Sequence, residues 1–132
     1  AHPYFERLTG VRVSAHFFIR RDGACIQFVS CLERAWHAGA SIWRGRSNCN
    51  DFSIGIELEG IEGAGFDDAQ YARLCELLTS LVGPAGCIDV AGHEHVSNGR
   101  KGDPGCGFDW GRTVAALGWP ARCFPEGVIT VT

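Results

Sequence analysis

The sequence contains no methionine among its 132 residues, and no apolar stretch is long enough to span a bilayer. Because methionine is missing, Ala1 is not an untouched translation start, and we expect a processed chain or a piece of a longer one. No signal peptide opens the chain, and because there is no spanning run and the net charge is −3, we expect no membrane partner. Acidic residues outnumber basic ones, 15 against 12, which argues against a nucleic-acid partner.

Closely spaced cysteine pairs are also missing. The seven cysteines include no Cys-x-x-Cys pair, which argues against a zinc ribbon or a thioredoxin motif. Several lie within apolar runs (Cys25, Cys75 and Cys87), where a free thiol behaves as a small hydrophobic side chain. A secreted disulfide scaffold is normally smaller and evenly paired. We therefore expect free thiols and a location in the reducing cytoplasm.

Two stretches show the alternation of apolar and polar residues that is typical of strands. Residues 11–20 alternate, and the Asp22-Gly23 pair predicts a tight hairpin that leads into a partner strand over residues 24–29. Residues 53–59 alternate in the same way and predict a second strand region. Between them, residues 35–50 have no periodicity and predict a long loop, which in a compact domain is usually functional.

The second half of the chain carries the helical signals. Asp67 with Gln70 three residues later predicts a capped helix, and Gly83-Pro84 predicts its end. Residues 109–117 predict a short helix that ends at Gly118. Beyond these we expect a short strand over 87–91, an exposed loop over 94–108 and a β-prone end over 128–132.

These elements predict one α+β domain over residues 1–132, with a sheet and at least one helix packed on it. No internal repeat or linker divides the chain.

Ionisable side chains occur at three places where packing of the core gives no reason for them. Glu57 lies on the polar side of the second strand region, where it is either a solvated edge residue or a general base. His93 and Asp103 have the donor atoms that bind zinc, but a single His-x₉-Asp spacing is weak support, and by spacing alone a satisfied loop histidine is favoured for His93. Lys101 could stabilise an oxyanion beside a dication.

Several blocks of sequence, in the same order, resemble one family from Ala1 to about Trp110. The blocks are Arg12–His16, Arg34–Gly39, Cys49–Gly60 and Gly92–Trp110. They are similar to the AmpD-type N-acetylmuramoyl-L-alanine amidases, which recycle peptidoglycan fragments in bacteria. The resemblance implies a mixed β-sheet flanked by helices, with a zinc ion in a groove on one face.

The resemblance also implies roles for four of these residues. His93 and Asp103 match two of the three zinc ligands of the family, Glu57 matches its catalytic glutamate, and Lys101 matches the lysine near the developing oxyanion. The implied reaction is hydrolysis of the amide bond between (1,6-anhydro-)N-acetylmuramic acid and L-alanine. The expected partner is a muropeptide, and the expected state is a monomer.

The loop over 35–50 is implied to line the substrate groove. Trp36, His37 and Ala38 are the expected contacts there, because an indole presents a flat face to a sugar or a peptide. Arg12 and Arg46 are expected to pair with carboxylates of the stem peptide, as a guanidinium does in a bidentate manner. A solvated surface charge is the alternative for both arginines.

The third zinc ligand of the family is a histidine on a strand upstream of the segment with which this chain begins. We therefore expect the 132-residue chain to bind zinc weakly. His95 is a weak candidate for the missing ligand, because a His-x-His pair on an extended segment points both rings to one side. The residues from 117 onward match nothing in the family.

Two other functions compete with the recycling amidase. One is a module that binds peptidoglycan fragments without hydrolysing them, and the other is a lytic amidase outside the cytoplasm. Because Glu57, Lys101 and Asp103 are all present, which a pure binder would not need, the sequence favours an enzyme.

Overall fold

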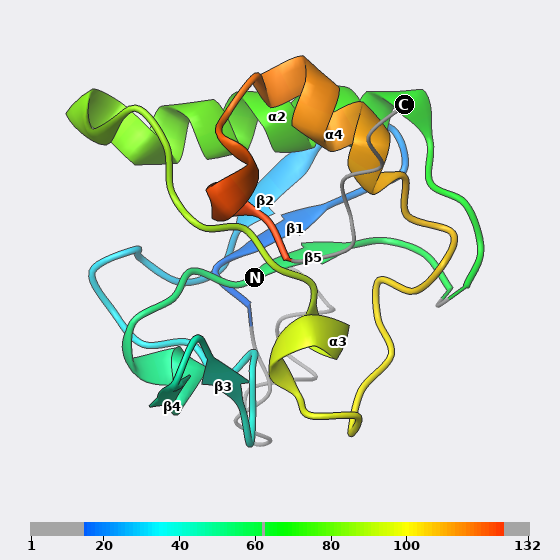
Figure 1. Ribbon diagram of the computed structural model, residues 1–132. Helices are drawn as coiled ribbons and strands as arrows, with labels where there is room; N and C mark the ends of the chain where they lie inside the picture. The colour runs from blue at the N-terminus through cyan, green and yellow to red at the C-terminus, as the bar shows by residue number, and fades with distance from the viewer. Residues whose placement is uncertain (1–14, 62, 126–132) are drawn as a thin grey trace.

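A mixed three-stranded sheet forms the centre of the computed structural model, which describes residues 15–61 and 63–125 (Figure 1). Strand β1 (Phe17–Ile19) is antiparallel to β2 (Cys25–Gln27) and parallel to β5 (Ile56–Leu58). Helices pack on this sheet, so the predicted α+β class with a mixed sheet is confirmed. The predicted strand positions 11–14 lie outside the described residues.

Strands β1 and β2 form the hairpin that the Asp22-Gly23 pair predicts. Gly23 has a φ of 88°, a region that side chains rarely adopt. The Arg20 N–H donates to the Ala24 carbonyl at 2.8 Å and closes the turn. The predicted apolar side of this strand region is buried at Ala15, Phe17 and Ile19, but the predicted alternation is wrong at His16, which is buried as well.

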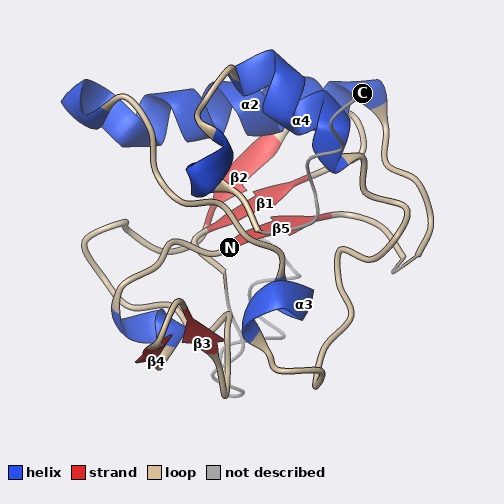
Figure 2. Cartoon of the chain, viewed as in Figure 1, coloured by secondary structure: helices blue, strands red, loops and turns tan. Residues whose placement is uncertain are grey.

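Helix α2 (Asp68–Val82) lies across one face of the sheet (Figure 2). Its start is the predicted capping box: the backbone N–H of Asp67 donates to Oε1 of Gln70 at 3.0 Å. The helix ends where Gly83-Pro84 predicts, and a 3₁₀ turn, η2 (Gly83–Ala85), follows.

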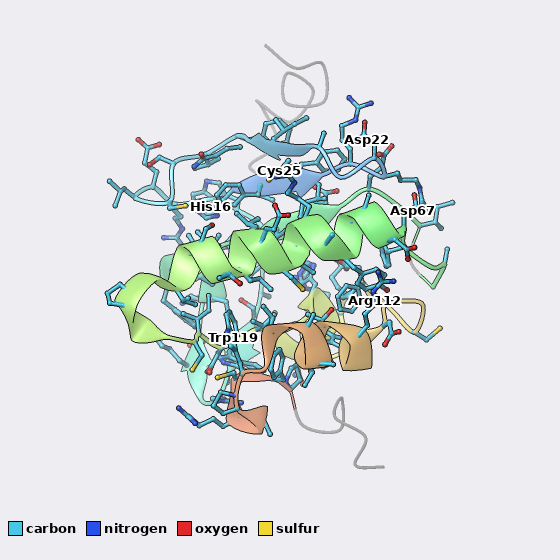
Figure 3. All side chains as sticks on the ribbon, turned by 90° about the horizontal axis from the view of Figure 1, so that it is seen from above. His16, Asp22, Cys25, Asp67, Arg112 and Trp119 are labelled. Carbon is cyan, nitrogen blue, oxygen red and sulfur yellow. The ribbon has the colours of Figure 1, made fainter. Side chains whose placement is uncertain are left out.

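Helix α4 (Trp110–Leu117) packs beside α2 and confirms the second predicted helix. The Asp109 carboxylate caps it by accepting the Arg112 N–H at 2.9 Å. The Arg112 guanidinium then donates to Asp68 at the start of α2, at 2.7 Å, so it links the N-terminal ends of the two helices (Figure 3).

The core lies between α2 and the sheet. Its buried members are Ile19, Tyr71, Leu74, Leu78 and Phe108, and partly buried side chains from β2, β5 and α4 pack against them. Gln70, 1% exposed, faces the same interior and donates to the carbonyls of Ile19 (3.3 Å) and Glu59 (2.9 Å). One buried amide thus fastens α2 to the ends of β1 and β5.

The long loop predicted over residues 35–50 contains regular structure, so that prediction is wrong in part. Strands β3 (Ile42–Trp43) and β4 (Arg46–Ser47) pair as a short antiparallel hairpin, and a 3₁₀ turn, η1 (Cys49–Asp51), follows. The turn residues Arg44 and Gly45 both have positive φ, 50° and 83°, which is the type I′ geometry of two-residue hairpins. An arginine at the first position hides this turn from sequence rules that look for Asn or Asp.

Two further predictions are corrected in the second half. Residues 87–91 do not form a strand; the Val90 N–H instead donates to the Cys123 carbonyl beside the 3₁₀ turn η3 (Ala121–Cys123), at 2.6 Å. The expected loop over 94–108 begins inside a short helix, α3 (His93–Val96). The β-prone residues 128–132 lie outside the described part of the chain.

All seven cysteines belong to the described residues, and all are free thiols. Among the described helices, none has both the length and the apolar character that crossing a membrane requires.

Candidate functional site

His93 is the first residue of α3, and one of its ring nitrogens is hydrogen-bonded within the protein. Its Nε2 lies 3.0 Å from the Ala38 carbonyl oxygen, and because a carbonyl only accepts, Nε2 must carry the proton. In a neutral ring this leaves Nδ1 with a bare lone pair. A backbone carbonyl that holds the far nitrogen in this way is the usual support of a metal-binding histidine.

Asp103 faces the other nitrogen of the same ring. Its Oδ1 lies 3.3 Å from Nδ1 of His93, and its backbone carbonyl accepts the Glu94 N–H at 2.8 Å, which ties the Asp103 segment to the start of α3. A bare imidazole nitrogen and a carboxylate oxygen are both acceptors. The contact is therefore favourable only when a proton or a metal cation lies between them.

The distance between these two atoms is compatible with a zinc ion. Two ligand atoms on a tetrahedral zinc, with bonds of ~2.0–2.1 Å, lie about 3.3 Å apart. The side chain of His93 is 19% exposed and that of Asp103 53% exposed, so an ion could reach the pair from solvent. Within residues 15–61 and 63–125, no third His, Cys, Asp or Glu completes a metal cluster.

Lys101 lies at the end of a tight turn that follows α3. Ser97, 3% exposed, donates its hydroxyl to the Lys101 carbonyl (3.1 Å) and accepts the Lys101 N–H (2.9 Å). Asn98 and Gly99 have positive φ within this turn, at 54° and 85°. The Lys101 residue itself is exposed, and its predicted role beside the oxyanion stays a prediction.

Glu57 lies in the middle of β5, opposite Phe18 of β1. Its neighbours Ile56 and Leu58 pack against the core under α2, and side chains alternate along a strand, so Glu57 belongs to the sheet face turned away from α2. The residue is exposed there. Its role as a base likewise stays a prediction.

His37 lies near His93 with its protonation fixed by a hydrogen-bonded chain. Its Nε2 is 2.7 Å from Ser53 Oγ, which itself donates to the Cys49 carbonyl at 2.6 Å, so Nε2 carries the proton. Nδ1 is buried and has no hydrogen-bond partner among the described residues. Burial, reinforced by the nearby His16 and His93, lowers the pKa of His37 to about 4.

The other predicted substrate contacts lie along the same loop. Ala38 is buried: its N–H donates to Asn50 Oδ1 at 2.8 Å, and its carbonyl is the acceptor for His93. Trp36 is half-buried under the Arg34 guanidinium, 4.5 Å from the ring centre. Arg46 is exposed and stacks on Phe52 at 4.0 Å rather than joining His93.

The remaining two predicted residues take different places. Arg12 lies outside the described residues. His95 does not share a side with His93, because both belong to α3, where two residues apart means roughly opposite directions. Its Nδ1 accepts the Gly92 N–H at 2.9 Å and its ring stands edge-on to Trp110. The extended His-x-His geometry that would have made His95 a ligand is therefore not formed, in line with His95 being a weak candidate.

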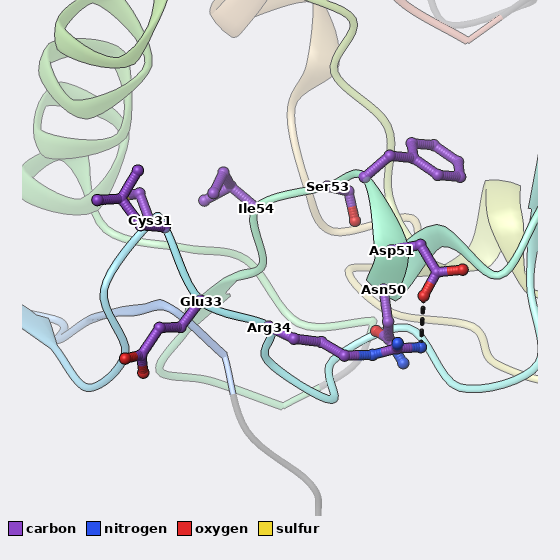
Figure 4. Close-up of a pocket in the computed structure, with 9 residues that line it drawn as sticks. Cys31, Glu33, Arg34, Asn50, Asp51, Ser53 and Ile54 are labelled. Atoms are coloured by element: carbon purple, nitrogen blue, oxygen red, sulfur yellow. Dashed lines mark ion pairs between the residues drawn. The ribbon is translucent and has the colours of Figure 1, made fainter.

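A separate hollow lies beside this loop. It has a volume of ≈ 450 Å³ between residues 31–34 and residues 50–54, and the Arg34–Asp51 ion pair of 2.6 Å belongs to its lining (Figure 4). A second hollow of ≈ 370 Å³ lies between the β3–β4 turn and His95. Neither is lined by the His93–Asp103 pair.

Sequence reasoning missed three residues that support the site. Asn50 holds the Ala38 N–H, Ser53 fixes the His37 tautomer, and Arg100 donates to the Ala38 carbonyl at 2.8 Å. Each lies in or next to one of the sequence blocks quoted above, but nothing in local spacing shows which carbonyl or ring it reaches.

Comparison with known proteins finds a family model and relatives that match this chain. A family model described as N-acetylmuramoyl-L-alanine amidase (Amidase_2) matches residues 1–106. The chain is 50% identical over 119 residues to the 1,6-anhydro-N-acetylmuramyl-L-alanine amidase AmpD of Citrobacter freundii, across 89% of this chain and 64% of that protein. It is 36% identical over 134 residues to the N-acetylmuramoyl-L-alanine amidase AmiD of Escherichia coli, across 86% of this chain and 48% of the relative.

Solved structures agree with this assignment. A crystal structure of a selenomethionine AmpD derivative superposes with a TM-score of 0.75 at 47% identity, covering 87% of this chain and 65% of the other. The E. coli AmiD complex with anhydro-N-acetylmuramic acid-L-Ala-D-γ-Glu-L-Lys superposes with a TM-score of 0.76 at 32% identity, covering 84% and 50%. The chain thus spans less than two thirds of the length of these relatives.

Proposed function

The chain belongs to the N-acetylmuramoyl-L-alanine amidase family, and on this premise we propose that it hydrolyses muropeptides with the help of zinc. The bond cleaved is the amide between (1,6-anhydro-)N-acetylmuramic acid and L-alanine. The observation that carries the proposal is the pair formed by His93 Nδ1 and Asp103 Oδ1, two acceptor atoms 3.3 Å apart, with Nε2 held by the Ala38 carbonyl. Such a pair favours a cation between its atoms.

His93 and Asp103 are the residues that would hold the metal. A zinc ion bound there would supply Lewis-acid polarisation and lower the pKa of a water molecule. The Ala38 carbonyl keeps the His93 ring in the tautomer that leaves Nδ1 free for the metal.

The protein's own side chains would handle the proton and the developing charge. Glu57 takes a proton from the attacking water as its oxygen adds to the lactyl carbonyl carbon. The Lys101 ammonium offsets the negative charge that develops on the carbonyl oxygen. The C–N bond then breaks, the proton passes to the departing L-alanine amine, and a lactyl carboxylate remains.

The free thiols support a cytoplasmic place for the reaction. All seven cysteines are free, and two of them, Cys31 and Cys106, are exposed. Free thiols persist in a reducing compartment. This supports recycling of muropeptide fragments in the cytoplasm over lysis of the wall outside it.

A substitution at Glu57 tests the catalytic part of the proposal. Glu57→Gln removes the base but keeps the shape of the side chain, so we expect kcat to fall by about 10²–10⁴-fold with zinc still bound. The assay measures release of the stem peptide from anhydro-N-acetylmuramyl-tripeptide by mass spectrometry. Glu59→Gln is the matched control. Glu59 lies two residues after Glu57 and accepts the Arg21 N–H, so its substitution should leave the rate unchanged.

Two results would contradict the proposal. Full activity of Glu57→Gln would remove Glu57 from the mechanism. Binding of the muropeptide by the wild-type protein without release of peptide, in the presence of zinc, would identify a binding module instead of an enzyme.

A further inference from the structure

Arg100 lies beside the His93–Asp103 pair without belonging to the predicted site. Its Nη2 donates to the Ala38 carbonyl at 2.8 Å and lies 3.4 Å from the Ala40 carbonyl. The same nitrogen is 3.5 Å from Nε2 of His93. One guanidinium group thus reaches the loop before β3 and the metal-binding histidine candidate together.

The Ala38 carbonyl is shared by two donors. It accepts Nε2–H of His93 at 3.0 Å and Nη2–H of Arg100 at 2.8 Å, so both of its lone pairs are used. The Ala38 N–H is also taken, by Asn50 Oδ1 at 2.8 Å. The peptide groups on both sides of Ala38 are therefore fixed in direction, and the direction of the carbonyl decides which tautomer of His93 is stable.

The approach of Arg100 to this loop depends on Gly39. A Cβ at position 39 would lie 2.5 Å from Nη2 of Arg100, and Gly39 has a φ of 60°. The guanidinium therefore rests on the bare backbone of the loop between Ala38 and Ala40. Arg100 itself is held from the other side, because its N–H donates to the Ser97 carbonyl at 3.2 Å in the turn after α3.

We infer that Arg100 is a positioning residue for the metal: it holds the Ala38 carbonyl against Nε2–H of His93 and so keeps Nδ1 directed at Asp103. The inference rests on the proposed function in that the ligand of this pair is zinc. It goes further by assigning the orientation of the histidine to a residue on a different segment, 62 positions from the carbonyl that it holds.

The physical reason is the cost of the alternative arrangement. Without the guanidinium, the Ala38 carbonyl loses one of its two donors and the loop can turn it toward water. His93 can then place its proton on Nδ1, toward the Asp103 carboxylate, which blocks the nitrogen that the metal needs. Supporting groups of this kind typically change metal affinity by about 10–100-fold.

The test compares three variants of the whole protein. Arg100→Met removes the guanidinium, Arg100→Lys keeps a positively charged N–H donor group without the planar fork, and Arg73→Met is the matched control. Arg73 Nε donates to the Gly23 carbonyl at 2.8 Å from helix α2, so this control removes a bond of the same kind away from His93.

The first readout is the tautomer of His93 in the metal-free protein, measured from imidazole ¹⁵N chemical shifts. Wild type and Arg73→Met should show the Nε2–H form, and Arg100→Met should show a mixture with the Nδ1–H form. The second readout is the zinc Kd from chelator competition, which should rise about 10-fold or more in Arg100→Met and be partly restored in Arg100→Lys.

An unchanged tautomer and an unchanged zinc Kd in Arg100→Met would overturn the inference. A wild-type protein that binds no zinc would instead contradict the proposed function. The tautomer in the metal-free variants still decides the role of Arg100 in that case, so the two failures can be told apart.

Discussion

His16 and His93 differ in the contact that their second ring nitrogen makes. His16 is 1% exposed, accepts the Gly55 N–H at Nδ1 (3.0 Å) and donates from Nε2 to the Glu33 carbonyl (2.8 Å), so both nitrogens are satisfied within the protein. Although the alternation pattern assigns it to the polar side of its strand, it is buried and joins three segments. His93 has one satisfied nitrogen and one facing a carboxylate, which is why it is the better candidate for a metal.

His37 predicts a pH dependence of stability. Its pKa is lowered in the folded protein to about 4, below the ordinary 6.5, so between these values the unfolded chain binds the additional proton. This contribution leaves stability at its full value above about pH 6.5 and reduces it as the pH falls toward 4. His37→Gln, whose amide can still donate to Ser53, should lose less thermal stability than wild type between pH 7 and pH 5.

The measurement is the melting temperature of both proteins across this pH range. The two proteins differ only at position 37, so the difference between the two curves isolates His37. Parallel curves would show that His37 does not carry the effect.

At the scale of the element, the docking of α2 depends on Gln70. Its side chain makes three hydrogen bonds, to the Asp67 N–H and to the carbonyls of Ile19 and Glu59, and it is buried. Gln70→Ala should therefore lower the free energy of unfolding by about 2–3 kcal/mol, at ~1 kcal/mol for each bond. Urea denaturation measures this change.

The control for this prediction lies on the exposed side of the same helix. Glu76 is exposed and pairs with Arg73 at 3.3 Å, so Glu76→Ala should change stability by no more than about 0.5 kcal/mol. Equal losses in the two variants would mean that Gln70 does not fasten α2 to the sheet.

Elements with local signals were predictable from the sequence. The Asp22-Gly23 turn, the Asp67 cap and the Gly83-Pro84 stop each depend on residues within four positions, and the structure has all three. The β3–β4 hairpin was not predictable, because its turn uses Arg44 in a conformation that arginine seldom adopts. Residues 87–91 have strand-like residues but no partner strand within residues 15–61 and 63–125, so no hydrogen-bonded ladder supports the local strand propensity there.

The candidate site was predictable in its members but not in its arrangement. Resemblance to a family pointed to His93 and Asp103, and the structure brings their side chains into contact. The carbonyl of Ala38, 55 positions before His93, and the guanidinium of Arg100 are joined by tertiary packing that no short pattern encodes.

On the scale of the whole molecule, the core and the candidate site lie on different sides of the sheet. Helices α2 and α4 cover one face and enclose the core, whereas α3 and the β3–β4 hairpin lie together beyond the other side (Figure 1). The His93–Asp103 pair is built where α3 meets the loop before β3. The geometry of this pair therefore depends on the contact between α3 and the loop before β3 rather than on the core.

Zinc held by His93 and Asp103 is central to the proposed mechanism, and the zinc affinity of the purified protein tests this most directly. We expect wild type to bind zinc weakly through these two side chains, and Asp103→Asn to bind it more weakly still, by over ~100-fold, which is more than the loss of a supporting group causes. Asp89→Asn is the control, since Asp89 pairs with Arg44 at 3.1 Å and Trp43. Equal zinc affinity in wild type and Asp103→Asn would contradict the account.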